Sequence, residues 1–206
     1  MRKITAFLLA AVLCCLTGTE TGYVPKAYEP VLELVRKGVA GERDALENED
    51  FNSAIYMESL YGEQTAGWAL LDLDGDEEEE LLIGRTDWQP EEKMLWIFDI
   101  WTIADGKAAR VARGGESRCI YLTREAGNSY GLYLEGNRSA AESVFEHYLI
   151  REGRLTNRKS INAFTDRASN KVSWTMNDTK MMEEQATEKI EKWKSAICQV
   201  NMTPVE

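Results

Sequence analysis

The spacing of apolar and polar residues along the chain predicts a mixture of helices and strands. Apolar side chains recur at helical spacing over residues 26–37 and 51–60, so we expect two N-terminal helices. Asp50 is expected to cap the first turn of the second. A C-terminal helix is predicted over residues 179–199. Its apolar stripe consists of Met182, Ala186, Ile190, Trp193 and Ile197.

Between these helices, short apolar or alternating runs are separated by turn residues. This pattern predicts about seven to nine antiparallel strands. The clearest candidate strands are residues 68–73, 80–85, 94–103, 108–112, 118–123, 130–135, 144–150 and 155–161. The run from Leu95 to Trp101 is apolar on both faces, which indicates a central strand covered on each side.

Two dipeptides between the candidate strands are typical of two-residue hairpin turns. Asp105-Gly106 and Glu152-Gly153 tolerate the positive φ angles that such turns require. The sequence therefore predicts a single α+β domain over residues 25–206. Its antiparallel sheet, a meander or a sandwich-like sheet, is expected to be flanked by N-terminal and C-terminal helices.

The start of the chain has the layout of a signal peptide. Met1-Arg2-Lys3 is basic, and the following residues up to Leu16 are almost all apolar. A bilayer span needs about 20 apolar residues, so this run is too short to cross a membrane and fits a targeting segment removed on export. We expect a signal peptide over residues 1–16, a flexible tether over 17–24 and an extracytoplasmic protein.

Cys14 and Cys15 are candidate sites for attaching a lipid anchor to the exported chain. Bacterial lipoproteins are cleaved just before a cysteine that then carries the lipid, although neither cysteine here has the usual residues before it. The polar tether is what a lipid-anchored domain needs. We predict lipidation at Cys14 or Cys15, with free secretion as the alternative, and contact with the membrane only through such an anchor.

The charge of the chain excludes one class of partner. The sequence has 24 basic and 35 acidic residues, a net charge of −11. Loss of Arg2 and Lys3 with the signal peptide would leave 22 basic residues and a net charge of −13. Binding to a phosphate backbone needs clustered basic residues, so we expect no nucleic acid partner.

An acidic loop carries the candidate chemistry. Residues 72–80 read Asp-Leu-Asp-Gly-Asp-Glu-Glu-Glu-Glu. Calcium takes six to eight oxygen ligands, and alternate side chains of a tight loop can converge on one ion. The predicted ligands are the carboxylates of Asp72, Asp74, Asp76 and Glu80 and the main-chain carbonyl of Glu78. The alternative is a solvated acidic hairpin that binds nothing.

The flanking strands and the spacing distinguish this loop from an EF-hand. The twelfth position, where an EF-hand has a bidentate glutamate, is Ile83. The loop instead resembles the nine-residue calcium loops of FG-GAP and integrin-type β repeats, whose sixth position is usually glycine. Glu77 occupies that position here, which costs about 1 kcal/mol if the loop requires a positive φ angle.

The mature chain resembles a family of uncharacterised Gram-positive exported proteins and lipoproteins. The likeness is carried by residues 68–76, 80–84, 98–101, 105–107 and 118–122, by Glu135-Gly136 and Tyr148, and by the glutamate-rich closing helix. Those relatives tend to be glycine-rich just after Glu135, where this chain has Asn-Arg-Ser-Ala-Ala. The resemblance implies export and a calcium-type loop, and it implies no activity.

The sequence has few residues in patterns typical of an active site. His147 is the only histidine, and a lone histidine in a strand is usually structural. The sequence has no glycine-framed serine elbow, and no paired cysteines or histidines at zinc-ligand spacing. A hydrolase that uses a pair of carboxylates, as in glycoside hydrolysis, stays open as the enzyme alternative.

Strand aromatics suggest a ligand surface instead. If Tyr121, Tyr133 and Tyr148 share an exposed face with Arg118 and Glu135, a platform for an envelope or extracellular ligand, such as a sugar or peptide, is expected. The alternative is that these aromatics belong to the core. We therefore expect a binding or structural module of the cell envelope with a calcium-stabilised hairpin.

Two cysteines remain after the signal peptide. An oxidising compartment would permit a disulfide between Cys119 and Cys198, worth about 4 kcal/mol in the chain-entropy model. Two separately buried thiols fit the sequence equally well.

Overall fold

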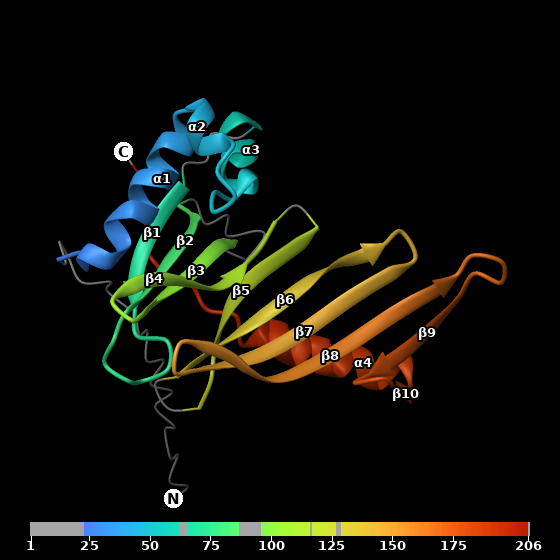
Figure 1. Ribbon diagram of the computed structural model, residues 1–206. Coiled ribbons are helices and arrows are strands. Elements are labelled where there is room, and N and C mark those ends of the chain that lie inside the picture. The colour runs from blue at the N-terminus through green and yellow to red at the C-terminus, as the bar shows by residue number, and fades with distance from the viewer. Residues whose placement is uncertain (1–22, 62–65, 87–95, 116, 127–128, 206) are drawn as a thin grey trace, which may run out of the picture.

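The computed structural model describes residues 23–61, 66–86, 96–115, 117–126 and 129–205. The predicted signal peptide, most of the predicted tether and the candidate lipidation sites Cys14 and Cys15 lie outside these residues. The fold is α+β, as predicted, with helices at both ends of a large antiparallel sheet (Figure 1). None of the described helices is long and apolar enough to cross a membrane.

The helices of the described chain are a short 3-10 helix η1 (Lys26–Tyr28), α1 (Glu29–Val39), α2 (Arg43–Leu46), α3 (Ser53–Tyr61) and α4 (Glu183–Ser195). The strands are β1 (Ala66–Leu71), β2 (Glu80–Arg85), β3 (Ile97–Ala104), β4 (Lys107–Arg113), β5 (Arg118–Arg124), β6 (Tyr130–Ser139), β7 (Glu142–Arg151), β8 (Arg154–Asp166), β9 (Lys171–Met176), β10 (Thr179–Met181) and β11 (Thr203–Pro204).

These strands form one sheet in the order β10-β9-β8-β7-β6-β5-β3-β2-β1-β11, and β4 pairs with β3 outside this path. Each of the eight candidate strands has a counterpart among β1–β8. The two predicted hairpin turns are confirmed, because Asp105, Gly106, Glu152 and Gly153 all have φ angles between 50° and 73°.

The C-terminal helix is shorter than predicted. Thr179 to Met181 form β10, and α4 begins only at Glu183. The reason is a tight turn at Asn177 and Asp178, whose φ angles of 47° and 65° fold β10 back onto β9. The helix also ends at Ser195, four residues earlier than expected, with Ala196 as its C-cap.

The cap of α3 also differs from the prediction. Asn52, and not Asp50, accepts a hydrogen bond from the main-chain N–H of Ala54 through its side-chain oxygen, at 3.1 Å. The side-chain nitrogen of Asn52 donates to the carbonyls of Phe98 and Gly114, which ties the start of α3 to the sheet. Asp50 instead forms an ion pair with Arg110 at 3.4 Å.

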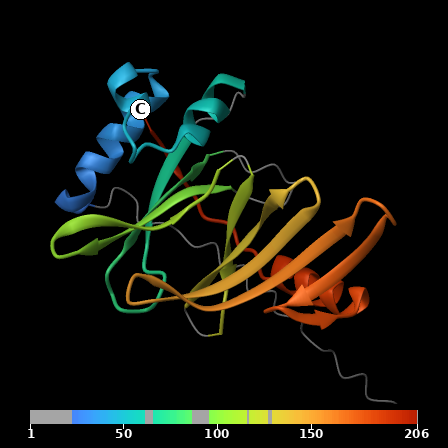
Figure 2. The same cartoon turned by 45° about the vertical axis from the view of Figure 1, so that its right-hand side comes forward.

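The sheet is strongly bent, so that β4 contacts β8, and three hydrophobic clusters follow from this shape (Figure 2). An inner cluster fills the concave side and includes Leu73, Leu82, Ile100, Ile120, Leu122, Leu132 and Ile150. An N-terminal cluster packs α1 and α3 against the other face of β1–β3, through residues such as Tyr28, Val31, Ile55, Leu81, Phe98 and Trp101. Strand β3 is thus covered on both faces, as predicted.

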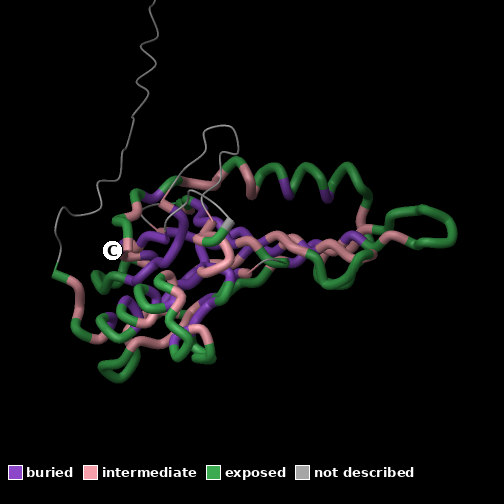
Figure 3. The backbone as a smooth tube through the Cα atoms, turned by 90° about the horizontal axis from the view of Figure 1, so that it is seen from above, coloured by how far each residue is buried: buried purple, intermediate pink, exposed green. Residues whose placement is uncertain are grey.

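The third cluster lies under α4. Ala186 and Ile190 of the helix pack against Tyr121, Tyr133 and Ile161 of the sheet. Figure 3 shows α4 running along one face of these strands, with the β8–β9 hairpin extending beyond the buried core. The predicted apolar stripe is therefore core packing at Ala186 and Ile190, whereas Met182 is 62% exposed at the helix start.

Candidate functional site

The acidic loop connects β1 to β2, and its shape is set by its own carboxylates. One oxygen of Asp72 accepts the main-chain N–H of Gly75 at 2.7 Å, and the other accepts that of Glu77 at 3.1 Å. Asp76 accepts the N–H of Glu78 at 2.9 Å. Aspartates therefore supply the turn hydrogen bonds that let this charged segment reverse direction.

Two loop residues adopt the left-handed conformation. Gly75 has a φ angle of 85°, which glycine tolerates, and Glu77 has a φ angle of 72°. The expected steric cost at the sixth position is thus present in the structure, because a side chain on Cβ crowds the backbone in this region.

Replacing Glu77 by glycine is expected to raise the free energy of unfolding by about 1 kcal/mol, because glycine relieves the left-handed strain. Urea denaturation of the wild-type and variant proteins measures this change. Glu79→Gly is the matched control: it removes the same charge from the same loop at a residue without a positive φ angle, so it should lower stability. Equal effects of the two substitutions would contradict the strain argument.

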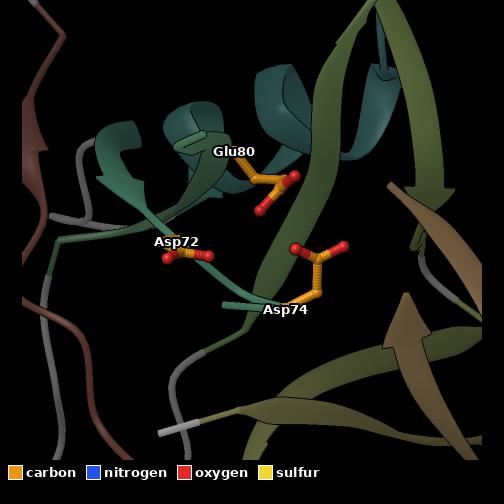
Figure 4. A group of neighbouring side chains, drawn as sticks. All are labelled: Asp72, Asp74 and Glu80. Atoms are coloured by element: carbon orange, nitrogen blue, oxygen red, sulfur yellow. The ribbon is translucent and has the colours of Figure 1, made fainter. Parts of the chain in front are cut away.

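Three of the predicted ligands come together in space. Asp72, Asp74 and Glu80 each place one carboxylate oxygen within 4.8 Å of the others. Figure 4 shows the carboxylates of Asp74 and Glu80 turned toward each other, with that of Asp72 beside them. The carboxylate of Asp76, which is exposed, does not join this group. The predicted ligand atom of Glu78 is its main-chain carbonyl, and that contact stays a prediction. The structure therefore assembles an acidic triad from the first, third and ninth loop positions.

The triad is tied to the body of the protein on two sides. Glu80 accepts the main-chain N–H of Leu73 at 3.0 Å and the hydroxyl of Thr102 in β3 at 3.2 Å. Asp74 accepts the main-chain N–H of Gly153, in the turn between β7 and β8, at 3.0 Å. The loop between β1 and β2 is thus tied to the β7–β8 hairpin, 79 residues further along the chain.

A third tie comes from the N-terminal helices. The Tyr28 hydroxyl lies 2.9 Å from the carbonyl of Glu79 and 3.2 Å from that of Trp101, where it can donate to either. Tyr28 is fully buried. The end of the acidic loop is therefore held in place from the core side.

The charges of the triad are poorly compensated. Within the described chain, no ion pair involves Asp72, Asp74 or Glu80. Asp74 Oδ1 is buried without a hydrogen-bond partner. Glu80 is only 1% exposed, and burial, followed by the negative charge of Asp74, raises its pKa to about 7. The arrangement is one that a cation would relieve.

The prediction that the three tyrosines share one exposed face with Arg118 and Glu135 is wrong. Tyr121 and Tyr133 stack on each other under α4, with 2% and 0% exposure. Glu135 accepts the Tyr133 hydroxyl at 2.8 Å and pairs with Lys194 of α4 at 2.9 Å. The α4 helix therefore covers the face on which sequence reasoning placed the ligand.

The other two members of that predicted set lie elsewhere. Arg118 and Tyr148 line a hollow together with Glu135, Glu146 and Arg158. In the strand pairing, Cys119 lies opposite Glu135 and Tyr121 opposite Tyr133, so Arg118 alternates to the opposite face of the sheet. Sequence reasoning missed Glu146 and Arg158, although strict alternation along β7 and β8 would have pointed to them.

His147, the lone histidine predicted in a strand, lies in β7 and is buried under α4. It is 5% exposed and stacks on Trp193 of α4 with ring centroids 5.6 Å apart. Its Nε2 lies 2.9 Å from a carboxylate oxygen of Glu125. Burial lowers the pKa of His147 despite that carboxylate.

Cys119 and Cys198 are free thiols, so the disulfide alternative is not what the structure has. The physical reason is that the side chains pack into different clusters. Cys119 lies against the cluster under α4, whereas Cys198 lies against the inner cluster and its main-chain N–H donates to the carbonyl of Leu122.

No protein-family model, curated protein or solved structure matches this chain. The resemblance to uncharacterised Gram-positive exported proteins, with the export and lipid anchoring that it implies, therefore stays a prediction.

Proposed function

We propose that this protein is an exported, lipid-anchored module of the cell envelope whose acidic loop binds calcium as a structural ion. The observation that carries the metal proposal is the convergence of Asp72, Asp74 and Glu80 without an ion-pair partner in the described chain. Calcium tolerates irregular oxygen geometry and takes main-chain carbonyls and waters as further ligands, whereas magnesium requires a near-octahedral site.

The role of the ion follows from what the triad already contacts. Asp74 reaches the β7–β8 turn, and Glu80 begins β2 and contacts β3 through Thr102. An ion held by both carboxylates would fasten the loop to the turn and so brace the bend of the sheet. Calcium in this site stabilises a fold and performs no chemistry.

The carboxylate-pair hydrolase receives less support from the same residues. Glu80 is 1% exposed, which keeps a substrate away from it. Glu146, the most buried acid of the hollow beside Arg118, is held by two arginines. A general acid needs a proton to give and access to the leaving group.

Amide hydrogen exchange tests the proposed bracing. We expect calcium to slow exchange of the Gly153 amide by about tenfold or more, because fixing Asp74 fixes its acceptor. The amide of Gly106, in the β3–β4 turn, serves as the control and should be unaffected. Unchanged exchange at Gly153 under saturating calcium would show that the ion, if bound, does not brace the sheet.

A further inference from the structure

We propose that the hollow on the face of the sheet opposite α4 binds the oxyanion group, a carboxylate or a phosphate ester, of a small polar ligand. The hollow has a volume of about 350 Å³. That size lies within the usual range of small-molecule sites, which is roughly 300–1,000 Å³. Its charged and aromatic lining comes from four adjacent strands: Arg118 of β5, Glu135 and Arg138 of β6, Glu146 and Tyr148 of β7, and Arg158 of β8.

Two of these arginines share one carboxylate. Arg118 Nη2 lies 2.5 Å from Glu146 Oε2, and Arg158 Nε lies 2.9 Å from Glu146 Oε1, with a second contact from Arg158 Nη2. Glu146 is only 4% exposed, so it is a fixed anchor at the base of the hollow. Glu135, the other acid of the lining, pairs with Lys194 of α4 at 2.9 Å. The two arginines therefore share one carboxylate, which leaves one positive charge uncompensated at this point of an acidic protein.

The donors of both guanidinium groups are only partly used. Each arginine carries five N–H donors, and the contacts to Glu146 engage one nitrogen of Arg118 and two of Arg158. The side chains are 48% and 51% exposed, so their remaining donors are accessible. Guanidinium forks held in this way match the geometry of a carboxylate or a phosphate.

Gly136 lets β6 approach the backbone that carries Arg118. A Cβ atom at this position would lie 2.1 Å from the main-chain oxygen of Ser117 and 3.0 Å from the Cα of Arg118. No side chain fits there without displacing the backbone that carries Arg118. The apolar part of the lining consists of Leu134, Gly136 and Val144.

A third arginine lines the hollow, with its charge paired to a glutamate. Arg138 pairs with Glu142 at 3.0 Å, and its side chain is 51% exposed. Tyr148 is a wall of the hollow and interacts with Arg158, whose pKa is raised first by Glu146 and also by this phenol. None of these residues belongs to the acidic triad, so this proposal is independent of the calcium proposal.

The test follows the side-chain Nε–H signals of Arg118 and Arg158 by NMR while the full exported chain is titrated with sodium phosphate or sodium glucuronate. We expect saturable shifts with at least one of these anions, beyond those caused by sodium chloride at matched ionic strength. Saturation by glucuronate alone would identify a carboxylate ligand, and saturation by phosphate alone a phosphate ester. No saturable shift with either anion would overturn the proposal.

Matched variants separate binding from bulk charge. Arg158→Gln should weaken binding at least about tenfold, which corresponds to 1.4 kcal/mol. Arg154→Gln makes the same change on the same strand outside the hollow and should leave binding unchanged. Thermal melts check that each variant folds, and Arg118→Gln provides a second variant if Arg158→Gln does not. If Arg154→Gln weakened anion binding as much as Arg158→Gln does, the loss would be explained by net charge alone, and the proposal would be contradicted.

Discussion

A variant with Asp74→Asn is expected to melt at the same temperature in calcium and in a chelator, whereas the wild-type protein gains stability from calcium. An ion at 100 times its Kd stabilises the fold by about 2.7 kcal/mol. For a chain of this size that corresponds to a rise in Tm of roughly 5–10 °C. Asparagine retains one oxygen for the Gly153 amide, so the substitution removes the charge and keeps the shape.

The matched control for this prediction is Asp76→Asn. Asp76 lies in the same loop and carries the same charge, yet it is exposed and outside the triad. Differential scanning fluorimetry of the three proteins, each with calcium, magnesium and chelator, gives the comparison. If Asp76→Asn removed the calcium effect and Asp74→Asn did not, the ion would have to sit elsewhere in the loop.

The second large effect is expected for Glu80→Gln. At pH 8 this variant should be more stable than wild-type in a chelator and less stable than wild-type in calcium. The folded protein raises the pKa of Glu80 from its ordinary value of 4.5 to about 7, so the folded state binds this proton more tightly than the unfolded state does. Stability from this group is therefore complete below about pH 4.5 and is lost as the pH rises through 7. At pH 8 without metal, the charged carboxylate costs up to about 3 kcal/mol.

Glutamine has the shape of the protonated acid and does not titrate. In a chelator at pH 8, Glu80→Gln should thus be more stable than wild-type by up to about 3 kcal/mol, and the difference should shrink toward zero near pH 4.5. Calcium at pH 8 should reverse the order, because only the wild-type protein has the full triad. Urea denaturation at several pH values measures the free energy of unfolding of both proteins, with calcium and with chelator. A variant less stable than wild-type in chelator at pH 8 would contradict this account of Glu80.

Much of the fold could be predicted because local rules and tertiary packing agree. β2 was predicted over residues 80–85 and is found there, since its apolar run is buried on both faces. β8 was predicted to end at residue 161, but it runs to Asp166 because β9 pairs with it along an exposed hairpin. Exposed strands of this kind carry little hydrophobic signal, so β9 was missed as well.

The site could be predicted only in part. Alternation along the loop pointed to Asp72, Asp74 and Asp76, but only the first two converge with Glu80, and Asp76 is exposed outside the triad. Spacing alone does not tell which loop carboxylates turn toward the sheet and which toward solvent. In the same way, alternation placed Tyr121 and Tyr133 on one face, and only the docking of α4 shows that this face is buried.

Calorimetric titration of calcium into the wild-type protein at neutral pH tests the central claim most directly. We predict saturable binding of one calcium ion, absent in the Asp74→Asn variant and weaker for magnesium. Absence of any saturable heat, together with an unchanged melting temperature, would contradict the claim and leave the triad as a solvated acidic hairpin.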